Sequence, residues 1–428
     1  MSDFDMMNLP EALRARVAEM GLTDPTPIQA QAIPHAMNGR DVMGLAQTGT
    51  GKTAAFGIPL IARLMEEGGK AAPKTARGLI LAPTRELAGQ IAHVLRDLTA
   101  MKVQIVVGGV SINPQIQRLS KGVDILVATP GRLLDLVDRR AVRLDQTGFL
   151  VLDEADQMLD LGFVHDLRKI ASMMGEDRQT MLFSATMPKQ MAEIAGSYLR
   201  SPIRVEVSPP GKAADKVTQA IHFIAKAEKT ALLIELMSEH KDERALVFTR
   251  TKHGADRLAR AVEKKGFAVA AIHGDKRQGQ RDRALAAFKA SEVKVMVATD
   301  VAARGLDIPD VKHVYNFDLP NVPEAYVHRI GRTARAGKDG AAIAFCAPDE
   351  MDQLKDIQKV LKTAIPVASG RPWEPVDDPD AKKKPSGGGR GRGRGRPGGG
   401  GGGGRPGGGA PGGAKPGNRR RRKPKPKA

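Results

Sequence analysis

Two short segments of the chain carry the side chains that phosphate chemistry requires. The first, Ala46-Gln-Thr-Gly-Thr-Gly-Lys-Thr53, lies between an apolar run and a helix-length amphipathic stretch, the setting in which a phosphate-binding loop forms. Its glycines let backbone amides face phosphates, the Lys52 ammonium reaches the β and γ oxygens, and the Thr53 hydroxyl is a ligand for Mg²⁺. The strict pattern opens with glycine, whereas this chain has Ala46. The segment predicts a nucleoside triphosphate site formed by Ala46, Gln47, Thr48, Gly49, Thr50, Gly51, Lys52 and Thr53.

The second segment, Phe149-Leu-Val-Leu-Asp-Glu-Ala-Asp156, is an apolar run that ends in carboxylates. Parallel sheets bind ligands at the carboxyl ends of their strands. Asp153 is therefore expected to hold Mg²⁺ through water, and Glu154 to orient and deprotonate an attacking water. Taken alone, three acids after a strand are more often a solvated helix N-terminus. Their occurrence together with Lys52 reverses that preference and predicts phosphoryl transfer to water.

The elements that must position these residues are indicated by apolar runs. Between Arg40 and Thr186, short continuous runs of Val, Ile and Leu alternate with helix-length amphipathic stretches, and the same rhythm returns from Ala245 to Cys346. Continuous runs without alternation indicate strands covered on both faces, as in a parallel, doubly wound sheet. The sequence predicts two tandem α/β domains. The expected strands are 41–46, 78–82, 103–107, 125–128, 149–152, 180–183, 245–248, 269–272, 294–298, 313–316 and 341–346.

Breaks in composition divide the chain further. Pro209, Pro210 and Gly211 interrupt any periodic pattern and predict an interdomain linker. Beyond Pro366 the sequence turns to Gly, Pro and Arg repeats, which bury too little apolar surface to offset the entropy of ordering, and we expect disorder there. The expected boundaries are 1–30 for a leading region of the first domain, 31–207 for its body, 208–216 for the linker, 217–368 for the second domain and 369–428 for the tail.

Positive charge is concentrated in the tail. Residues 381–428 hold 16 of the 67 Lys and Arg and none of the 48 Asp and Glu, which leaves 51 basic and 48 acidic residues elsewhere, a net of +3 out of +19. Composition therefore indicates nucleic-acid affinity for the tail alone. Cys346 is the only cysteine, so an internal disulfide is excluded. Because neither a leader segment nor a bilayer-length apolar run occurs, we expect a cytoplasmic protein without membrane contact.

Asp153-Glu-Ala-Asp156 is one of several motifs, in characteristic order across Phe4 to Pro348, by which the chain resembles the DEAD-box family of ATP-dependent RNA helicases. The resemblance implies two RecA-like domains. Gly21-Leu-Thr-Asp-Pro-Thr-Pro-Ile-Gln29 resembles the Q motif of the 1–30 region and implies that Gln29 binds the adenine edge while Phe4 stacks on its face. Carboxamide chemistry agrees, because an amide pairs with adenine N6 and N7 but not with guanine O6 and N7. For Phe4, simple packing of an aromatic residue is an equally good interpretation.

The resemblance also assigns RNA contacts to both domains. Pro83-Thr-Arg-Glu-Leu87, Gly108-Gly109 and Thr129-Pro-Gly-Arg132 each follow an expected strand and resemble motifs Ia, GG and Ib. Such side chains and amides bind phosphates without discriminating bases. Outside this constellation, Pro-Thr-Arg would simply be a turn with a helix cap. With motifs IV and V and the signature between them, the implied RNA-binding residues are Thr84, Arg85, Gly109, Thr129, Arg132, Thr249, Arg250, Gln278, Arg281, Thr299 and Asp300.

Two long motifs of the second domain imply a share in the nucleotide site. Ala298-Thr-Asp-Val-Ala-Ala-Arg-Gly-Leu-Asp307 resembles motif V, whose Gly305 and Asp307 would contact the nucleotide. His328-Arg-Ile-Gly-Arg-Thr-Ala-Arg-Ala-Gly337 resembles motif VI, in which Arg332 and Arg335 would be arginine fingers that bridge γ-phosphate oxygens. Ala334 stands where many members of the family have glycine.

Ser184-Ala-Thr186 resembles motif III, which couples hydrolysis to strand separation. The resemblance assigns this coupling role to Ser184, Thr186 and His328, and helix capping is the alternative for the two hydroxyls.

One ATP is expected to lie between the two domains, because the second domain has no Gly-Lys-Thr loop. Lys52 would hold the γ-phosphate from one side and Arg332 and Arg335 from the other, so that ATP favours closure and hydrolysis reopens the pair. The expected activity is RNA-stimulated ATP hydrolysis coupled to local, sequence-independent RNA duplex separation or ribonucleoprotein remodelling.

Two alternatives remain open. An ATP-gated RNA clamp or annealing chaperone would act mainly through the tail, but a lock without turnover needs no general base at Glu154. A DNA helicase is the other alternative, because phosphate contacts do not distinguish the sugars. The compact core and Gly-Arg-rich end resemble bacterial helicases of the RhlE type. Single-stranded and duplex RNA are the expected partners, ribosome-precursor or RNA-degradation complexes are candidate partners, and the core is expected to be monomeric.

Overall fold

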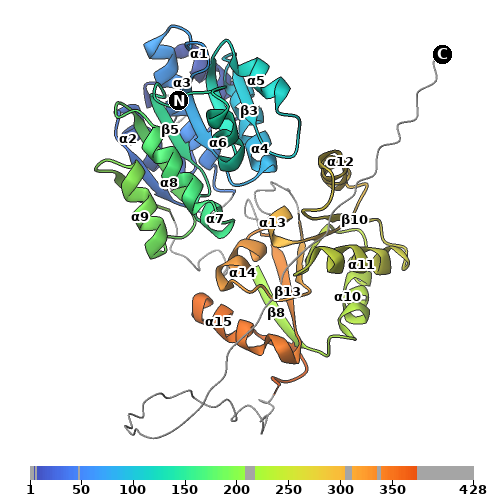
Figure 1. Ribbon diagram of the computed structural model, residues 1–428. Helices are drawn as coiled ribbons and strands as arrows, with labels where there is room; N and C mark the ends of the chain where they lie inside the picture. Colours follow the sequence, from blue (N-terminus) through green and yellow to red (C-terminus); the bar gives the residue numbers. More distant parts are fainter. Residues whose placement is uncertain are drawn as a thin grey trace, which may run out of the picture. The chain divides into compact units, whose positions relative to one another are not determined.

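The fold was analysed in a computed structural model of the chain (Figure 1). The structure describes residues 4, 7–46, 49–207, 217–303, 311–334 and 339–373, all of which lie in one of the two units into which the chain divides, Met1–Glu374. The predicted linker 208–216 and residues 374–428 lie outside the described residues. The same is true of the predicted site residues Gln47, Thr48, Gly305, Asp307 and Arg335.

The first domain alternates helices with short strands. Local sequence explains where several helices begin: at the start of the second helix, Gln29 accepts from the Thr26 amide and Pro27 occupies the first turn. The elements are α1 (Glu11–Glu19), α2 (Pro27–Met37), β1 (Val42–Leu45), α3 (Lys52–Glu67), β2 (Ala76–Leu81), α4 (Arg85–Leu98), β3 (Val103–Val106), α5 (Asn113–Leu119), β4 (Val123–Ala128), α6 (Pro130–Asp138), β5 (Phe149–Leu152), α7 (Ala155–Asp160), α8 (Val164–Met173), β6 (Gln179–Ser184), α9 (Lys189–Tyr198) and β7 (Ile203–Glu206).

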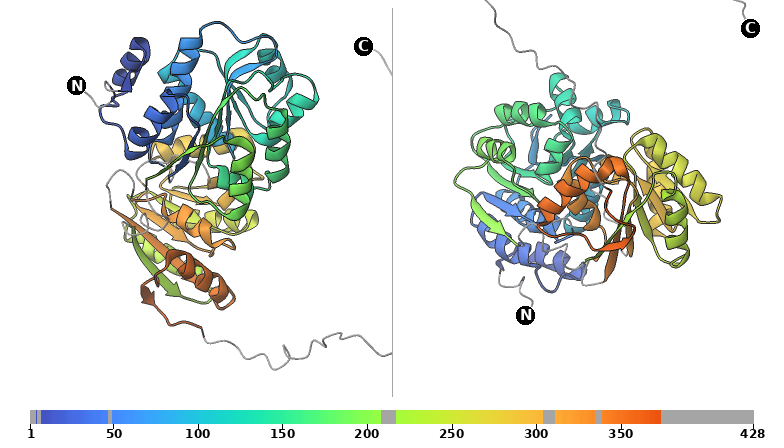
Figure 2. Two further views of the ribbon diagram at one scale, coloured as in Figure 1. Left: turned by 90° about the vertical axis from the view of Figure 1, so that its left-hand side faces the viewer. Right: turned by 90° about the horizontal axis from the view of Figure 1, so that it is seen from below.

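These strands form one parallel sheet in the order β3-β4-β2-β5-β6-β1-β7. Successive residues of β5 point to opposite faces of the sheet. Phe149 and Val151 pack with α1 to α4, and Leu150 and Leu152 pack with α5 to α9. Helices accordingly flank both faces of the sheet in the two views of Figure 2. Burial on both faces is the reason that the strand sequences are continuously apolar.

The second domain repeats this plan. Its strand order is β10-β11-β9-β12-β13-β8-β14, which is the order of the first sheet when strands are numbered within each domain. Again Leu246 and Phe248 of β9 face one core, and Ala245 and Val247 face the other. The elements are β8 (Val217–Phe223), α10 (Lys229–Ser238), β9 (Ala245–Phe248), α11 (Lys252–Glu263), β10 (Val269–Ile272), α12 (Gln278–Lys289), β11 (Val295–Ala298), α13 (Asp300–Ala303), β12 (His313–Asn316), α14 (Pro323–Ile330), β13 (Gly340–Cys346), a 3₁₀ turn (Pro348–Glu350), α15 (Met351–Leu361) and β14 (Val367–Ser369).

Two tandem α/β domains with parallel sheets are thus confirmed, and every expected strand is present. The structure adds β7, β8 and β14, for which the sequence lacks a continuous apolar run. The Ile-Arg-Val-Glu sequence of β7 alternates, with Val205 buried and with Arg204 and Glu206 exposed. Thr218, Gln219 and His222 interrupt the apolar residues of β8, and the three residues of β14 are all exposed.

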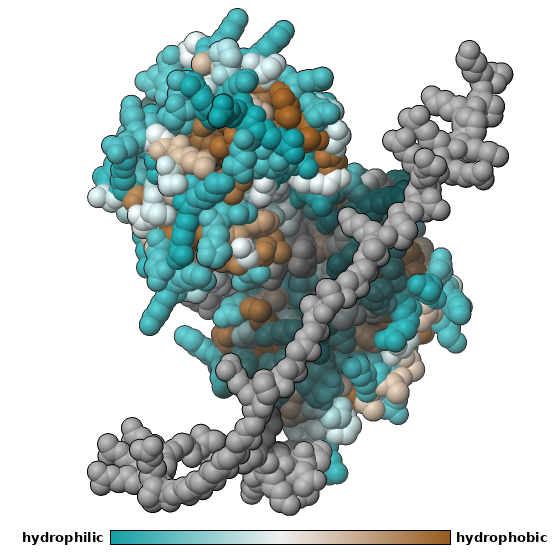
Figure 3. Space-filling view, in the orientation of Figure 1, coloured by the Kyte–Doolittle hydropathy of each residue, from teal (hydrophilic) through white to brown (hydrophobic). Residues whose placement is uncertain are grey.

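Among the described residues, no helix combines the length and the apolarity that crossing a bilayer would require. Hydrophilic residues dominate the face drawn in Figure 3, where hydrophobic ones form scattered patches.

Candidate nucleotide and RNA sites

The loop between β1 and α3 has the backbone geometry of a phosphate cradle. Gly49 and Gly51 adopt φ angles of 86° and 88°, a left-handed region in which glycine is favoured. Lys52 is the first residue of α3, and its buried ammonium donates to the carbonyl oxygen of Ala46 over 3.2 Å. A positive charge and a helix N-terminus therefore meet in one loop, which suits an anion.

Two carboxylates follow β5 beside this loop. An Asp153 oxygen lies 3.9 Å from the Lys52 ammonium, and Asp153 and Glu154 are each only 2% exposed. Glu154 has a φ of 50°, an uncommon conformation for a residue with a side chain, and its amide donates to Asp153 Oδ1 over 3.0 Å. Burial raises the pKa of the Asp153 carboxyl to about 6, with the Lys52 charge opposing the rise and Glu154 reinforcing it.

These residues fit a bound Mg²⁺. Burial disfavours a charged carboxylate, as the raised pKa of Asp153 shows, and a divalent cation would reverse that balance. Mg²⁺ prefers oxygen ligands and keeps several waters. Asp153 and the hydroxyl of Thr53, in the first turn of α3, supply such oxygens.

Asp156 connects the predicted coupling residues. Its Oδ2 accepts hydrogen bonds from the Ala185 amide at 3.1 Å and from the amide and hydroxyl of Thr186, each at 2.9 Å. Ser184 Oγ accepts from the Asp156 amide over 3.3 Å and donates to the Thr186 carbonyl over 2.7 Å. His328 Nε2 of the second domain lies 3.9 Å from Asp156 Oδ2. All three predicted coupling residues therefore meet around one carboxylate.

The predicted adenine-binding residues are both buried in the first domain. Gln29 is 2% exposed; its oxygen accepts from the Thr26 amide over 2.9 Å, and its nitrogen donates to the Gly51 carbonyl over 3.0 Å. The carboxamide is thus tied to the phosphate loop and keeps one further donor and one lone pair. Phe4 is 1% exposed and belongs to the core cluster formed with α1 to α4. Packing therefore accounts for Phe4 in this structure, and its stacking on adenine stays a prediction.

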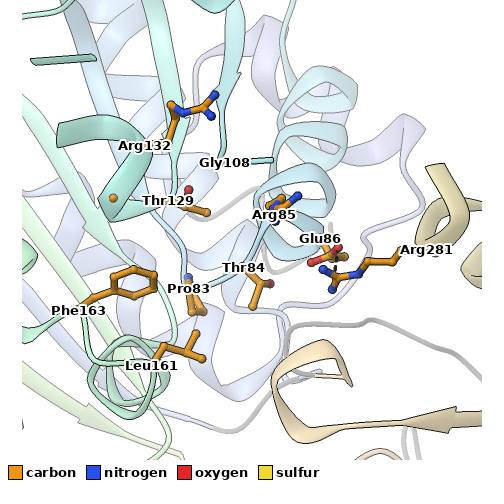
Figure 4. Close-up of a pocket in the computed structure, with 11 residues that line it drawn as sticks. Pro83, Thr84, Arg85, Glu86, Gly108, Thr129, Arg132, Leu161, Phe163 and Arg281 are labelled. Carbon is orange, nitrogen blue, oxygen red and sulfur yellow. Dashed lines mark ion pairs between the residues drawn. The ribbon is translucent and has the colours of Figure 1, made fainter. Parts of the chain in front are cut away.

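Four of the five predicted RNA-binding residues of the first domain, all but Gly109, line a cavity of about 470 Å³ at the carboxyl ends of β2, β3 and β4 (Figure 4). A Cβ at Gly109, whose φ is 70°, would lie 1.9 Å from Arg85 Nη1, so the place of this arginine requires glycine. Thr84 caps α4 by accepting from the Leu87 amide over 3.2 Å. Arg132 donates to the Val110 carbonyl over 3.1 Å, and Thr129 is a lining residue.

Residues from α12 of the second domain contact the same cavity. Arg281 Nη2 lies 2.9 Å from Glu86 Oε1 (Figure 4), and Gln278 Nε2 donates to that oxygen over 3.2 Å. Arg85 Nη1 donates to Gln278 Oε1 over 3.2 Å. Three predicted phosphate binders are therefore linked to Glu86 and to one another, and an incoming phosphate would compete with this acid.

Other predicted residues of the second domain are held within that domain. Arg329, 2% exposed, pairs bidentately with Asp300 at 2.6 and 2.8 Å, which fixes the predicted RNA contact at the start of α13. Thr249 and Thr299 are buried after β9 and β11, and Arg250 Nη2 pairs with Glu350 Oε1 over 2.6 Å.

The described part of the predicted arginine-finger segment ends at Ala334. Arg332 is 3% exposed. Ala334 has a φ of 54°, a left-handed conformation that explains why glycine suits this position in the family.

Sequence reasoning missed three residues that organise these sites: Glu86, Asp156 and Arg329. Asp156 had a signal, since it closes the acidic motif after β5. Glu86 and Arg329 lie inside quoted motifs, but their roles depend on partners far away in the sequence, Arg281 and Asp300.

Comparison with known proteins identifies the family of the chain. The family model of the DEAD/DEAH box helicases matches residues 26–194, and that of the helicase conserved C-terminal domain matches residues 228–337. The DEAD-box ATP-dependent RNA helicase CshA of Bacillus cereus is 43% identical over 365 residues, which cover 85% of this chain and 69% of the relative. The chain belongs to the DEAD-box ATP-dependent RNA helicases. CshA of Bacillus subtilis is 44% identical over 362 residues, covering 84% of this helicase and 72% of the relative.

Solved structures of DEAD-box proteins share the fold. S. cerevisiae Dbp5 bound to RNA and ADP BeF3 superimposes with a TM-score of 0.75 at 32% identity, covering 86% of this chain and 96% of that one. Mss116p bound to ssRNA and AMP-PNP gives a TM-score of 0.77 at 27% identity, covering 85% and 78%. The two tandem domains are therefore RecA-like, as expected, and this helicase is an ATP-hydrolysing enzyme. The predicted likeness to the RhlE type stays a prediction, because the named relatives are CshA proteins.

Proposed function

We propose that this helicase hydrolyses ATP with Lys52 on the β and γ phosphates, Asp153 at the metal and Glu154 as general base. The observation that supports this most directly is the meeting of the buried Lys52 ammonium with Asp153, 3.9 Å away, at the end of the strand that leads to Glu154. Phosphoryl transfer requires positioning and charge stabilisation more than covalent help. The left-handed backbone of Glu154 aims its carboxylate from a fixed turn.

Thr53 and Asp153 would hold Mg²⁺, which supplies charge neutralisation for the phosphates when bound. Gln29 would bind the adenine edge and Phe4 its face. The remaining loop residues Ala46, Gln47, Thr48, Gly49, Thr50 and Gly51 would offer backbone groups to the phosphates, and Gly305, Asp307, Arg332 and Arg335 would approach from the second domain.

RNA would be bound by its backbone and without sequence preference. Seven of the eleven residues around the 470 Å³ cavity are threonines, glycines and arginines, which suit phosphate and sugar rather than base edges. The RNA-bound states named for Dbp5 and Mss116p support RNA as the substrate of this chain. Release of Arg281 from Glu86 and of Arg85 from Gln278 would supply the cations.

Coupling would run through Asp156. Ser184 and Thr186 bond to it from the end of β6, and His328 approaches it from the motif that contains Arg332. Closure of the domains on ATP would tighten this network and complete the RNA site, and hydrolysis would loosen it. The cycle separates short RNA duplexes locally or remodels ribonucleoproteins.

Further features complete the proposal. Residues 208–216 act as the linker between domains 31–207 and 217–368, after the Q-motif region 1–30, and the basic tail 369–428 captures RNA. The helicase works in the cytoplasm as a monomeric core and joins ribosome-precursor or RNA-degradation complexes.

Replacing Glu154 by Gln should lower RNA-stimulated ATP turnover about 100-fold or more while ATP and RNA still bind together, because only the base is lost. Steady-state phosphate release and fluorescent-nucleotide titration measure the two effects. Glu193→Gln, an exposed acid on α9, is the matched control and should behave as wild type. Equal turnover in wild type and Glu154→Gln would remove the general base and favour an ATP-gated RNA clamp.

A further inference from the structure

Three potential metal ligands meet at the end of the second sheet that lies opposite the carboxyl ends of its strands. The ligand atoms of His240, Glu243 and His313 all lie within 4.8 Å of one another. His240 and Glu243 belong to the turn between α10 and β9, in which the Glu243 amide donates to the His240 carbonyl over 3.1 Å. His313 is the first residue of β12 and is paired with Ala245 of β9. The adjacent strands β9 and β12 therefore bring this turn beside His313.

The contacts within this histidine–glutamate cluster converge on the carboxylate. His313 Nε2 hydrogen-bonds to Glu243 Oε2, and His240 Nδ1 lies 3.7 Å from the same oxygen. The two imidazole rings stack with centroids 4.3 Å apart and planes 24° apart. The His313 side chain is 9% exposed, whereas those of His240 and Glu243 are each 44% exposed. One ligand is thus anchored in the sheet, and two have room to adjust.

Two imidazole nitrogens and one carboxylate oxygen form a ligand set that Zn²⁺ takes together with a water. With Zn–ligand bonds of about 2.0–2.2 Å in tetrahedral geometry, the ligand atoms would lie roughly 3.3–3.5 Å apart. Rotation of the two exposed side chains can bring the three atoms from within 4.8 Å to that spacing. Mg²⁺ does not suit this set, because it prefers oxygen ligands in octahedral geometry.

We propose that His240, Glu243 and His313 bind Zn²⁺, with water as the fourth ligand, and that the ion fastens the turn before β9 to the start of β12. This site is separate from the nucleotide and RNA sites and does not depend on them. The alternative is an ordinary histidine–glutamate hydrogen bond with a stacked second ring. The two interpretations differ in whether the exposed His240 contributes to metal affinity.

The surroundings of His313 set the expected strength. Its Nδ1 is buried and has no hydrogen-bond partner within the described part of the chain. A metal at Nε2 places the ring proton on Nδ1, where no acceptor orients it. Loss of such an outer partner weakens metal binding by about 10–100-fold. The dissociation constant for Zn²⁺ is therefore expected in the micromolar range rather than below it.

The test is calorimetric titration of the full-length protein, dialysed free of metal and nucleotide, with zinc chloride. Wild type should bind one Zn²⁺ that His240→Asn and Glu243→Gln bind at least about tenfold more weakly, since each loses one of three ligands. His253→Asn removes another exposed histidine, on α11, and should bind as wild type does. Magnesium chloride should give the same heats in wild type and His240→Asn.

A second measurement keeps the proposal open to refutation if the buried His313 cannot be replaced without unfolding. Zinc at about 100 times the wild-type dissociation constant should raise the thermal midpoint of wild type by roughly 5 °C, and that of His240→Asn, which binds at least about tenfold more weakly, by about half as much or less. Equal zinc affinity in wild type, His240→Asn and Glu243→Gln would overturn the site, as would an equal thermal shift in all three.

Discussion

The two domains place a lysine at the same point of the same topology and use it differently. Lys52 begins α3 after β1, and Lys229 begins α10 after β8, the strand that occupies the corresponding position in the second sheet. Each ammonium lies 3.9 Å from an aspartate that follows the central strand of its sheet. This aspartate is Asp153, after β5, in the first domain and Asp318, after β12, in the second.

The difference is what faces the second lysine. Lys229, 1% exposed, pairs with Glu350 and also donates to the carbonyls of Phe317, at 2.7 Å, and Phe345, at 3.3 Å. The Glu350 carboxylate further accepts from Arg250 at 2.6 Å and from the amides of Leu319 and Ala347 at 3.1 and 3.0 Å. A side chain of the protein thus takes the place that an anion would take.

The loop sequences explain why one site remains open to a ligand. Gly49 and Gly51 allow the left-handed turns of the first loop, whereas residues 224–228 of the second contain no glycine. The comparison teaches that a parallel sheet and a lysine at a helix N-terminus do not by themselves make a nucleotide site. What decides it is the backbone of the loop and whether an acid of the domain pairs directly with the lysine, as Glu350 does with Lys229.

The largest expected effect is on stability. Lys229→Met should lower the free energy of unfolding of the second domain by about 3 kcal/mol or more, because Glu350 loses a buried counter-ion. Lys52→Met, the matched change in the first domain, should abolish ATP binding with much less effect on stability. Urea unfolding followed by the fluorescence of Trp373, the only tryptophan, reports on the second domain.

The double variant Lys229→Met, Glu350→Gln is the control and should recover part of the loss, because the carboxylate charge is gone. If Lys229→Met left the free energy of unfolding unchanged, the pair of Lys229 and Glu350 would not stabilise the second domain, and this interpretation of the pair would be wrong.

The next largest expected effect is on RNA-stimulated ATP turnover, through the arginine proposed to act from the second domain. Arg332→Ala should reduce RNA-stimulated turnover about 100-fold with little change in nucleotide affinity, because its guanidinium acts on charge that develops in the transition state. Lysine should be a poor substitute at this position. Steady-state ATPase assays beside equilibrium nucleotide titrations separate the two quantities. Full activity in Arg332→Lys would remove the finger assignment.

The smallest expected effect is on the pKa of Cys346, which reports on the charge of Glu350. Burial raises the pKa of the Cys346 thiol to about 12, Glu350 reinforces the rise and Lys229 opposes it. Glu350→Gln should therefore lower this pKa, since the lysine then acts without the acid. Each unit of decrease raises the thiolate fraction about tenfold at a fixed pH, which the pH dependence of alkylation measures. Asp349→Asn, an exposed neighbour, should change the profile less; equal profiles for Glu350→Gln and wild type would contradict the coupling.

Much of this could be predicted from the sequence, because the signals are local. Phe149–Leu152 is continuously apolar because both faces of this strand are covered by helices. The glycines of the phosphate loop indicate the left-handed backbone conformations that this loop adopts. The pair formed by Lys229 and Glu350 could not be predicted, because the two residues lie 121 positions apart and the sequence around each gives no signal of its partner. The same holds for Glu86 with Arg281. Strand β7 was missed because its exposed Arg204 and Glu206 interrupt the apolar run.

Each sheet takes all of its strands from one contiguous stretch of chain, with β7 at Ile203–Glu206 completing the first and β8 starting the second at Val217. During synthesis, which proceeds at about 5–20 residues per second, domains generally fold as units with the N-terminal one first. The first sheet needs no residue made after Glu206. The first domain, with Lys52 and Asp153 already in place, can therefore fold on the ribosome before Arg332 has been translated.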